Sequence, residues 1–171
     1  MPTTKTDLLI VGAGPSALTC AIYTTRENID TLLIEKSAVG GIVSTVDKID
    51  NYPGFPDGIE GYLLAEEFEK QAKRFGAKIE NGEVKSISKS GKDILVSLDD
   101  RQVLAKSVLI ATGGSNRKVN VPGEEEYYGR GVHYCATCDG AFYFGKRIVV
   151  IGGGNAAIQE AMYLTKFATK V

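Results

Sequence analysis

Two short apolar segments, far apart in the chain, are built to the same pattern. Residues 7–11 read Asp-Leu-Leu-Ile-Val, residues 147–151 read Arg-Ile-Val-Val-Ile, and each segment runs directly into a glycine-rich turn. A continuous apolar run of this length, bounded by glycine, is typical of a strand that is buried on both faces of a parallel sheet. A helix-forming stretch follows each turn. The repeated pattern therefore predicts an α/β fold with two Rossmann-like nucleotide-binding domains in tandem.

The sequence between the two glycine turns alternates between helix and strand patterns. Residues 16–27 predict a helix with Leu18, Ala21 and Ile22 on its inward face, and residues 62–75 predict a second amphipathic helix. The remaining predictions are buried strands at 31–35 and 108–114, a loop over 36–61 and an antiparallel meander over 77–105.

A polar segment at residues 115–118 marks a boundary between two domains. The sequence thus predicts a first domain of residues 1–116 and a second of residues 117–171. We expect the second domain to be incomplete, because it holds one strand pattern and one helix pattern.

Composition and charge exclude several classes of protein. The chain has 171 residues, with 20 basic and 21 acidic side chains and a formal net charge of −1, which excludes a nucleic-acid binder that works through bulk positive charge. The hydrophobic content of 43% is that of a folded chain, and no long uncharged run suits a membrane helix. Residues 1–7 lack a signal-peptide pattern. With three cysteines, we expect a cytoplasmic protein in which a close cysteine pair serves redox chemistry or metal binding.

The first glycine turn, Gly12-Ala13-Gly14-Pro15-Ser16-Ala17, fits a dinucleotide-binding fingerprint. Gly12 allows the tight turn, Gly14 lets the backbone approach a pyrophosphate, and the small Ala17 lets the helix lie close to the strand. The phosphates then meet the amino terminus of the helix. Glu35 ends the next predicted strand, where a carboxylate can bind ribose hydroxyls. The alternative is a plain strand–turn–helix followed by an exposed acid.

The second glycine turn, Gly152-Gly153-Gly154-Asn155-Ala156-Ala157, fits the same template with Ala157 as the small third residue. A second dinucleotide site in one chain indicates electron transfer between two nucleotide cofactors, most naturally a bound flavin and a diffusible nicotinamide. This prediction has less support than the first, because no further strand pattern follows it in the sequence.

The segment Cys135-Ala136-Thr137-Cys138-Asp139 places two cysteines three positions apart. Such a pair can close a small disulfide and hold one thiol at a lowered pKa for dithiol–disulfide exchange. Asp139 could move protons to and from the departing thiolate. Zinc is the alternative, with His133 as a third ligand, but structural zinc takes four ligands and the only other cysteine is Cys20. We favour a metal-free redox pair and interpret His133, the only histidine, as incidental.

Together these motifs indicate a family. The sequence resembles the low-molecular-weight, bacterial-type thioredoxin reductases over nearly its whole length, and its most specific feature is Cys-Ala-Thr-Cys-Asp just before a second nucleotide fingerprint. The other matching segments are Gly12-Ala13-Gly14-Pro15, Gly40-Gly41, Asn51-Tyr52-Pro53-Gly54, Ala111-Thr112-Gly113, Gly129-Arg130-Gly131-Val132 and Gly152-Gly153-Gly154-Asn155.

The resemblance implies FAD and NADPH as cofactors and thioredoxin as the partner of a homodimeric enzyme. Reduced flavin would attack Cys138 and release Cys135 as the thiolate that attacks thioredoxin, with Asp139 as the acid–base residue. The residues implied to hold FAD are Gly12, Gly14, Pro15, Ala17, Glu35, Gly41, Ile42, Asn51, Ala111, Thr112 and Gly113. Those implied to hold NADPH are Gly152, Gly154, Asn155 and Ala157.

Three departures from the family pattern matter. Ile42 stands where the family usually has glutamine close to the flavin, and Ala17 replaces a frequent glycine. The sequence also stops after one strand and one helix of the NADPH domain, so we expect a carboxy-terminally truncated fragment. The open alternatives are a related flavin disulfide reductase or dithiol oxidase with another electron donor, such as ferredoxin, and an inactive fragment.

Overall fold

A computed structural model describes residues 2–171 of the chain. These residues form two compact units. The first consists of the chain up to Asp50 together with Phe55–Ser115, and the second of Asn51–Gly54 together with Asn116–Val171. Within the described residues, no helix is long and apolar enough to cross a membrane.

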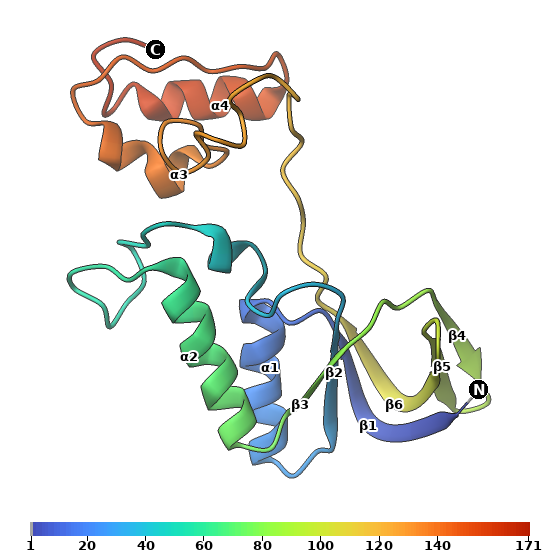
Figure 1. The fold of residues 1–171 in the computed structure, drawn as a ribbon. Coiled ribbons are helices and arrows are strands. Elements are labelled where there is room, and N and C mark those ends of the chain that lie inside the picture. Colours follow the sequence, from blue (N-terminus) through green and yellow to red (C-terminus); the bar gives the residue numbers. More distant parts are fainter. Residues whose placement is uncertain (1) are drawn as a thin grey trace. The chain divides into compact units, whose positions relative to one another are not determined.

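The first unit is built around one six-stranded sheet (Figure 1). β1 pairs in parallel with both β2 and β6, and β2 pairs in parallel with β3, whereas β5 is antiparallel to β4 and β6. This arrangement confirms the α/β class. The strands are, in spatial order, β3 (Lys78–Asn81), β2 (Thr31–Glu35), β1 (Thr3–Val11), β6 (Gln102–Ile110), β5 (Asp93–Ser97) and β4 (Ser86–Ser90).

Two helices connect the parallel strands of this sheet. α1 (Pro15–Arg26) links β1 to β2, and α2 (Gly61–Arg74) precedes β3 and packs against α1. Both predicted helices are confirmed, each displaced by one residue. The predicted loop between β2 and α2 also contains a short 3₁₀ helix, η1 (Gly41–Thr45), which contacts α2.

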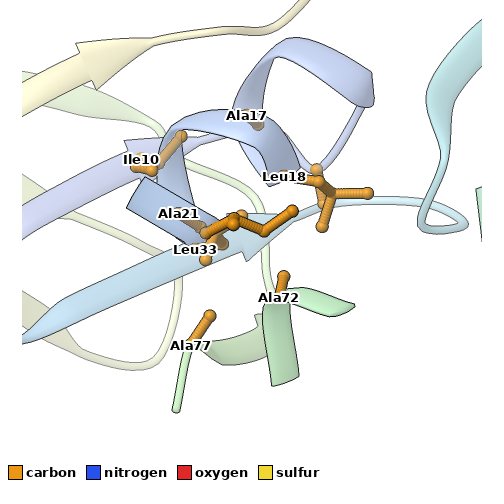
Figure 2. Close-up of a cluster of buried hydrophobic side chains, with 9 residues drawn as sticks. Ile10, Ala17, Leu18, Ala21, Leu33, Ala72 and Ala77 are labelled. Carbon is orange, nitrogen blue, oxygen red and sulfur yellow. The ribbon is translucent and has the colours of Figure 1, made fainter. Parts of the chain in front are cut away.

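Figure 2 shows the core cluster formed by the two helices and the parallel strands. Ile10 of β1 and Leu33 of β2 are fully buried, together with Leu18 and Ala21 of α1 and Ala72 of α2. The small alanines let the helices lie close to the strands. This packing holds the amino terminus of α1 in a fixed position at the end of β1.

A second core cluster lies on the other face of the same strands. Leu9 of β1 and Ile34 of β2 are buried there with Val96 of β5 and Val103 of β6. Because successive side chains of a strand point to opposite faces, the neighbours Leu9 and Ile10 belong to different clusters. The prediction that this apolar run is buried on both faces is confirmed.

The predicted meander is wrong at its first strand, and the strand predicted at 108–114 is wrong in its bounds. β3 is parallel to β2 at one edge of the sheet, and only β4, β5 and β6 form the meander. Local alternation of polar and apolar residues does not encode the direction of pairing. The run at residues 108–110 is the end of the long β6, and there Ile110 is 67% exposed rather than buried.

Short helices make up the second unit. α3 (Ala136–Asp139) is a single turn followed by the 3₁₀ helix η2 (Gly140–Tyr143), and α4 (Asn155–Leu164) packs against α3. Gly140 permits this packing, since a Cβ there would lie only 2.9 Å from Cδ2 of Leu164.

The buried strand predicted at residues 147–151 is not formed. Arg147 and Lys170 make an isolated parallel bridge, and Ile148 N donates to Lys170 O at 2.9 Å, without a continuing ladder. Val149 is 83% exposed and Ile151 72% exposed. Among the described residues no other strand lies beside this run, so it lacks the neighbours that bury β1.

Candidate functional site

The first glycine turn leaves β1 between the ends of two neighbouring strands. Gly12 N donates to Ile34 O at 2.8 Å, and Ala111 N donates to Val11 O at 2.9 Å. Gly12 has φ +105°, and a Cβ there would lie 2.4 Å from the carbonyl oxygen of Ala111. Only glycine fits this position, both for its left-handed backbone and for the approach of the β6 end.

Glu35 fixes the turn from the end of β2. Its Oε2 accepts a hydrogen bond from Ala13 N at 2.7 Å, and its Oε1 accepts one from Ser37 N at 2.8 Å. Gly40 N in turn donates to Ala13 O at 2.8 Å. A carboxylate has about four lone-pair sites, so Glu35 retains acceptor capacity for ribose hydroxyls. The sequence analysis missed its second role, which is to hold the glycine turn.

The amino terminus of α1 has the form that a pyrophosphate requires. Gly14 is the extended N-cap with no side-chain cap, and Pro15 follows it in the first turn. A Cβ built on Gly14 would meet no atom within 4 Å, so the space beside the helix terminus is open. Ala17 is fully buried. Exposed backbone N–H groups at a helix start bind phosphate, and the residues therefore fit a dinucleotide.

The other residues implied to lie near a flavin are distributed over both units. A Cβ on Gly41 would lie 3.3 Å from the Cα of Gly14, which brings η1 close to the first glycine turn. Ile42 follows on η1 and is 46% exposed. Thr112 and Gly113 are exposed after β6. Asn51 is exposed and belongs to the second unit.

A disulfide joins Cys135 to Cys138 in the second unit, with their Cα atoms 5.3 Å apart. Cys135 is the N-cap of α3, and its Sγ accepts a hydrogen bond from Cys138 N at 3.2 Å. The Thr137 hydroxyl lies 3.4 Å from the same sulfur. These donors would stabilise a thiolate on Cys135 once the disulfide opens. Cys20 is the free cysteine, and burial raises the pKa of its thiol.

His133 makes two polar contacts that the sequence pattern did not predict. Its Nδ1 lies 3.1 Å from Oδ2 of Asp139, and its Nε2 lies 2.6 Å from the Tyr143 hydroxyl. The side chains of His133 and Asp139 are only 19% and 17% exposed. Burial, followed by the negative charge of Asp139, raises the pKa of Tyr143. The imidazole thus joins the predicted acid–base residue to a phenol.

A buried carboxylate organises the segment that leads to the cysteines. Glu124 is 6% exposed and accepts hydrogen bonds from Val119 N at 2.8 Å and Asn120 N at 2.6 Å, and another from the Tyr134 hydroxyl. The hydroxyl and then the Val119 N–H lower the pKa of Glu124. The same contact raises the pKa of Tyr134 to about 12. This cluster, which sequence reasoning missed, joins the backbone of residues 119–121 to the side chain of Tyr134, the residue directly before the N-cap Cys135.

The second glycine turn has part of the predicted geometry. Gly152 has φ +149°, and a Cβ there would lie 3.0 Å from the Cβ of Ala157, so the small third residue lies close to the turn. Gly154 is the extended N-cap of α4, which begins at Asn155, and a Cβ on Gly154 would meet nothing within 4 Å. The turn and helix start fit a dinucleotide phosphate, although the strand before them is not formed.

The described residues contain no group of three or more His, Cys, Asp or Glu side chains that could hold a metal ion. The zinc alternative therefore finds no ligand set around the cysteine pair in residues 2–171.

Comparison with known proteins is consistent with this geometry. The model of the pyridine nucleotide-disulphide oxidoreductase family matches residues 6–171. Thioredoxin reductase of Bacillus subtilis (strain 168) is 44% identical over 96% of this chain and 52% of its own length. Thioredoxin reductase of Treponema pallidum (strain Nichols) is 45% identical over 98% of this chain and 55% of its own length.

A solved structure gives the same picture. The crystal structure of thioredoxin reductase from Streptococcus pyogenes MGAS5005 matches with a TM-score of 0.95 at 43% identity, over 98% of this chain and 55% of that one. The chain spans about half the length of the curated relatives it matches.

Proposed function

Because this chain belongs to the pyridine nucleotide-disulphide oxidoreductase family, we propose that it carries the redox disulfide and the two dinucleotide loops of a thioredoxin reductase. Electrons pass from NADPH through FAD to Cys135–Cys138 and on to thioredoxin. The observation that carries the proposal is the Cys135–Cys138 disulfide at the start of α3, followed directly by Asp139. We assign residues 1–116 to the amino-terminal portion of an FAD domain and residues 117–171 to the start of an NADPH domain.

FAD and NADPH are the cofactors of thioredoxin reductases. When bound, the flavin accepts hydride from the nicotinamide and supplies the electron pair that opens the disulfide. Gly12, Gly14 and Pro15 admit the FAD pyrophosphate to the start of α1, and Ala17 keeps α1 close to β1. The free lone pairs of Glu35 accept from the ribose hydroxyls.

The remaining cofactor contacts come from four further segments. Gly41 and Ile42 on η1, together with the turn Ala111, Thr112 and Gly113, would hold the flavin, and the family resemblance assigns Asn51 to the same cofactor. Gly152, Gly154, Asn155 and Ala157 receive the NADPH pyrophosphate at the start of α4. The open space beside both helix starts supports these roles.

The cysteines have different roles. Cys138 is exposed and Cys135 half-buried, and the hydrogen bonds from Cys138 N and Thr137 reach the sulfur of Cys135. We therefore assign Cys138 as the sulfur attacked when electrons enter. Cys135 leaves as the stabilised thiolate, which then attacks the disulfide of thioredoxin. Asp139 moves the proton to and from the departing thiolate. The working enzyme is a cytoplasmic homodimer.

Replacement of Cys138 by serine tests the electron path in the complete natural protein that contains this sequence. We expect NADPH to reduce the flavin of Cys138→Ser at the wild-type rate, followed by no thioredoxin reduction, because the electron pair has no disulfide to enter. Stopped-flow flavin absorbance and thioredoxin turnover measure the two steps. Cys20→Ser is the matched control and should leave both steps unchanged. Rapid turnover of thioredoxin by Cys138→Ser would overturn the proposal.

Ile42 supports a second candidate function. An apolar side chain on η1, 46% exposed and directly after Gly41, replaces the polar residue that the family usually places by the flavin. This change favours a related flavin disulfide reductase or dithiol oxidase with another donor. Steady-state rates of disulfide reduction with NADPH, NADH and reduced ferredoxin separate the two candidates. If only reduced ferredoxin supports the reaction, NADPH is not the electron donor.

A further inference from the structure

We propose that His133 is a positioning residue that relays protons between Tyr143 and Asp139 when the Cys135–Cys138 disulfide opens and closes. This inference rests on the proposed function, in which Asp139 handles the proton of the departing thiolate. Nothing in the sequence pattern assigns His133 a role. All three side chains belong to the second unit, so the inference depends on that unit alone.

Asp139, His133 and Tyr143 form a line of two polar contacts, one at each nitrogen of the imidazole ring. The imidazole has Asp139 Oδ2 at 3.1 Å from Nδ1 and the Tyr143 hydroxyl at 2.6 Å from Nε2. The rings of His133 and Tyr143 meet edge to face with centroids 5.1 Å apart, which fixes their relative orientation. Low exposure of the His133 and Asp139 side chains limits direct exchange of their protons with water.

A neutral imidazole can satisfy Asp139 in either protonation state. When the carboxylate is ionised, Nδ1–H donates to it and Nε2 accepts from the Tyr143 hydroxyl. When Asp139 is protonated, it donates to Nδ1, and Nε2–H donates to the Tyr143 oxygen. The ring therefore changes tautomer while every polar atom of the line keeps a partner.

The proton balance of one transfer is closed. Water gives a proton to the Tyr143 oxygen, the Tyr143 hydroxyl proton moves to Nε2, and the Nδ1 proton moves to Asp139. His133 and Tyr143 are neutral before and after, so one proton has passed from solvent to the carboxylate. Asp139 then gives that proton to the leaving thiolate, and the reverse sequence carries a thiol proton outward. Tyr143 is half-buried and is the member of the line at the solvent end.

Other titratable groups come from the elements that carry or pack against these three residues, and from Lys146, whose backbone N–H donates to Tyr143 O at 3.0 Å. α3 itself contributes Asp139, η2 contributes Tyr143, and α4, which packs against α3, contributes Glu160 and Tyr163. Among the described residues, no hydrogen bond or ion pair joins Glu160 or Tyr163 to His133. The preceding segment brings Tyr134, whose hydroxyl is bound to Glu124. Asp139 is thus the charged partner of the imidazole.

Opening of the disulfide by dithiothreitol tests the relay without thioredoxin or NADPH. In the complete natural protein, single-turnover opening is followed by alkylation and mass spectrometry. We expect His133→Gln to slow opening about tenfold at neutral pH, less than the hundredfold or more that a direct proton donor contributes. Added imidazole should restore the rate, because a free base can bring protons to Asp139 and glutamine cannot. A purely structural role of His133 would not respond to imidazole.

A double-substitution cycle separates this inference from the proposed function. In an Asp139→Asn background, His133→Gln should have no further effect, because the relay acts only through the carboxylate. If Asp139→Asn slows opening and His133→Gln does not, the relay is wrong and the proposed function stands. If neither slows opening, the acid–base role of Asp139 in the proposed function also fails.

Tyr143→Phe tests the same line without altering the imidazole and keeps the aromatic contact with His133. It should slow opening in the same direction and lower the solvent deuterium isotope effect. An unchanged rate would remove Tyr143 from the relay. Tyr127→Phe, an exposed tyrosine of the same unit, is the matched control and should behave as the wild type.

Discussion

The two glycine turns of this chain share a sequence pattern and differ in what supports them. Gly12 follows a strand with a neighbour on each side and two core clusters around it. Gly152 follows a run of the same apolar composition that has one isolated bridge and exposed valine and isoleucine side chains. The pattern alone thus gives the turn its local geometry. Neighbouring strands that bury the preceding run are needed to hold the turn rigidly.

Core substitutions should give the largest difference in stability between the two regions. Leu33→Ala removes a fully buried side chain from the first cluster, and we expect it to lower the free energy of unfolding by about 2–5 kcal/mol. Val149→Ala, at a position 83% exposed, should change it by less than about 0.5 kcal/mol. Urea unfolding followed by circular dichroism measures both. Equal losses would mean that residues 147–151 are buried in solution.

Substitution of the two leading glycines gives the next largest difference. Gly12→Ala places a methyl group 2.4 Å from a backbone carbonyl oxygen at φ +105°, and a strained residue of this kind costs about 1–3 kcal/mol. At Gly152, with φ +149°, alanine is strained too, but the methyl group meets the Ala157 Cβ at 3.0 Å rather than a backbone oxygen at 2.4 Å, and a shift of the neighbour can relieve that contact. We therefore expect Gly152→Ala to cost less than Gly12→Ala in the same unfolding experiment.

Gly14→Ala is the matched control at the first turn. It meets no atom within 4 Å, so the fold should keep its stability while FAD binding weakens because the methyl group occupies the phosphate approach. Fluorescence titration with FAD reports this. Wild-type affinity would show that the cofactor does not approach at Gly14.

The smallest expected effect concerns Glu124 and the second unit, which is stabilised by polar contacts more than by burial. Its hydrogen bonds lower the pKa of Glu124, so their contribution to stability is present at neutral pH and is lost as the pH falls through that lowered value. Glu124→Gln should remove this acid dependence from the melting temperature. In the same variant, tyrosinate absorbance should show Tyr134 titrating below its wild-type value of about 12. Unchanged titration would contradict the contact.

Much of the first unit could be predicted because its signals are local. The apolar runs of β1 and β2 and the stripe on α1 specify buried strands and a helix, and the glycine turn between them follows. The direction of β3 could not be predicted, because pairing depends on how the intervening helix returns the chain. For residues 147–151, local composition predicts a strand whose formation depends on neighbours distant in sequence.

The site was predictable in its sulfur chemistry and its glycines, and less so in its hydrogen-bond network. The spacing of Cys135 and Cys138 permits a small disulfide, and the structure contains it. His133 contacts Asp139, six residues later, and Tyr143, ten residues later. His133 lies before the helices, Asp139 in α3 and Tyr143 in the 3₁₀ helix η2, so no single sequence periodicity predicts the contacts. A signal was available, because Asp139 and Tyr143 are four positions apart and can share one face of consecutive helical turns.

The pairing of β1 with β6 has a consequence for the synthesis of the protein. Their register runs from Thr3 opposite Gln102 to Val11 opposite Ile110, so the longest ladder of the sheet joins segments separated by about a hundred residues. At translation rates of about 5–20 residues per second, β6 leaves the ribosome roughly 5–20 s after β1. During that interval β1 has only β2 as its neighbour and keeps one edge open to other chains. Among the strands of this sheet, β1 therefore waits longest for one of its neighbours.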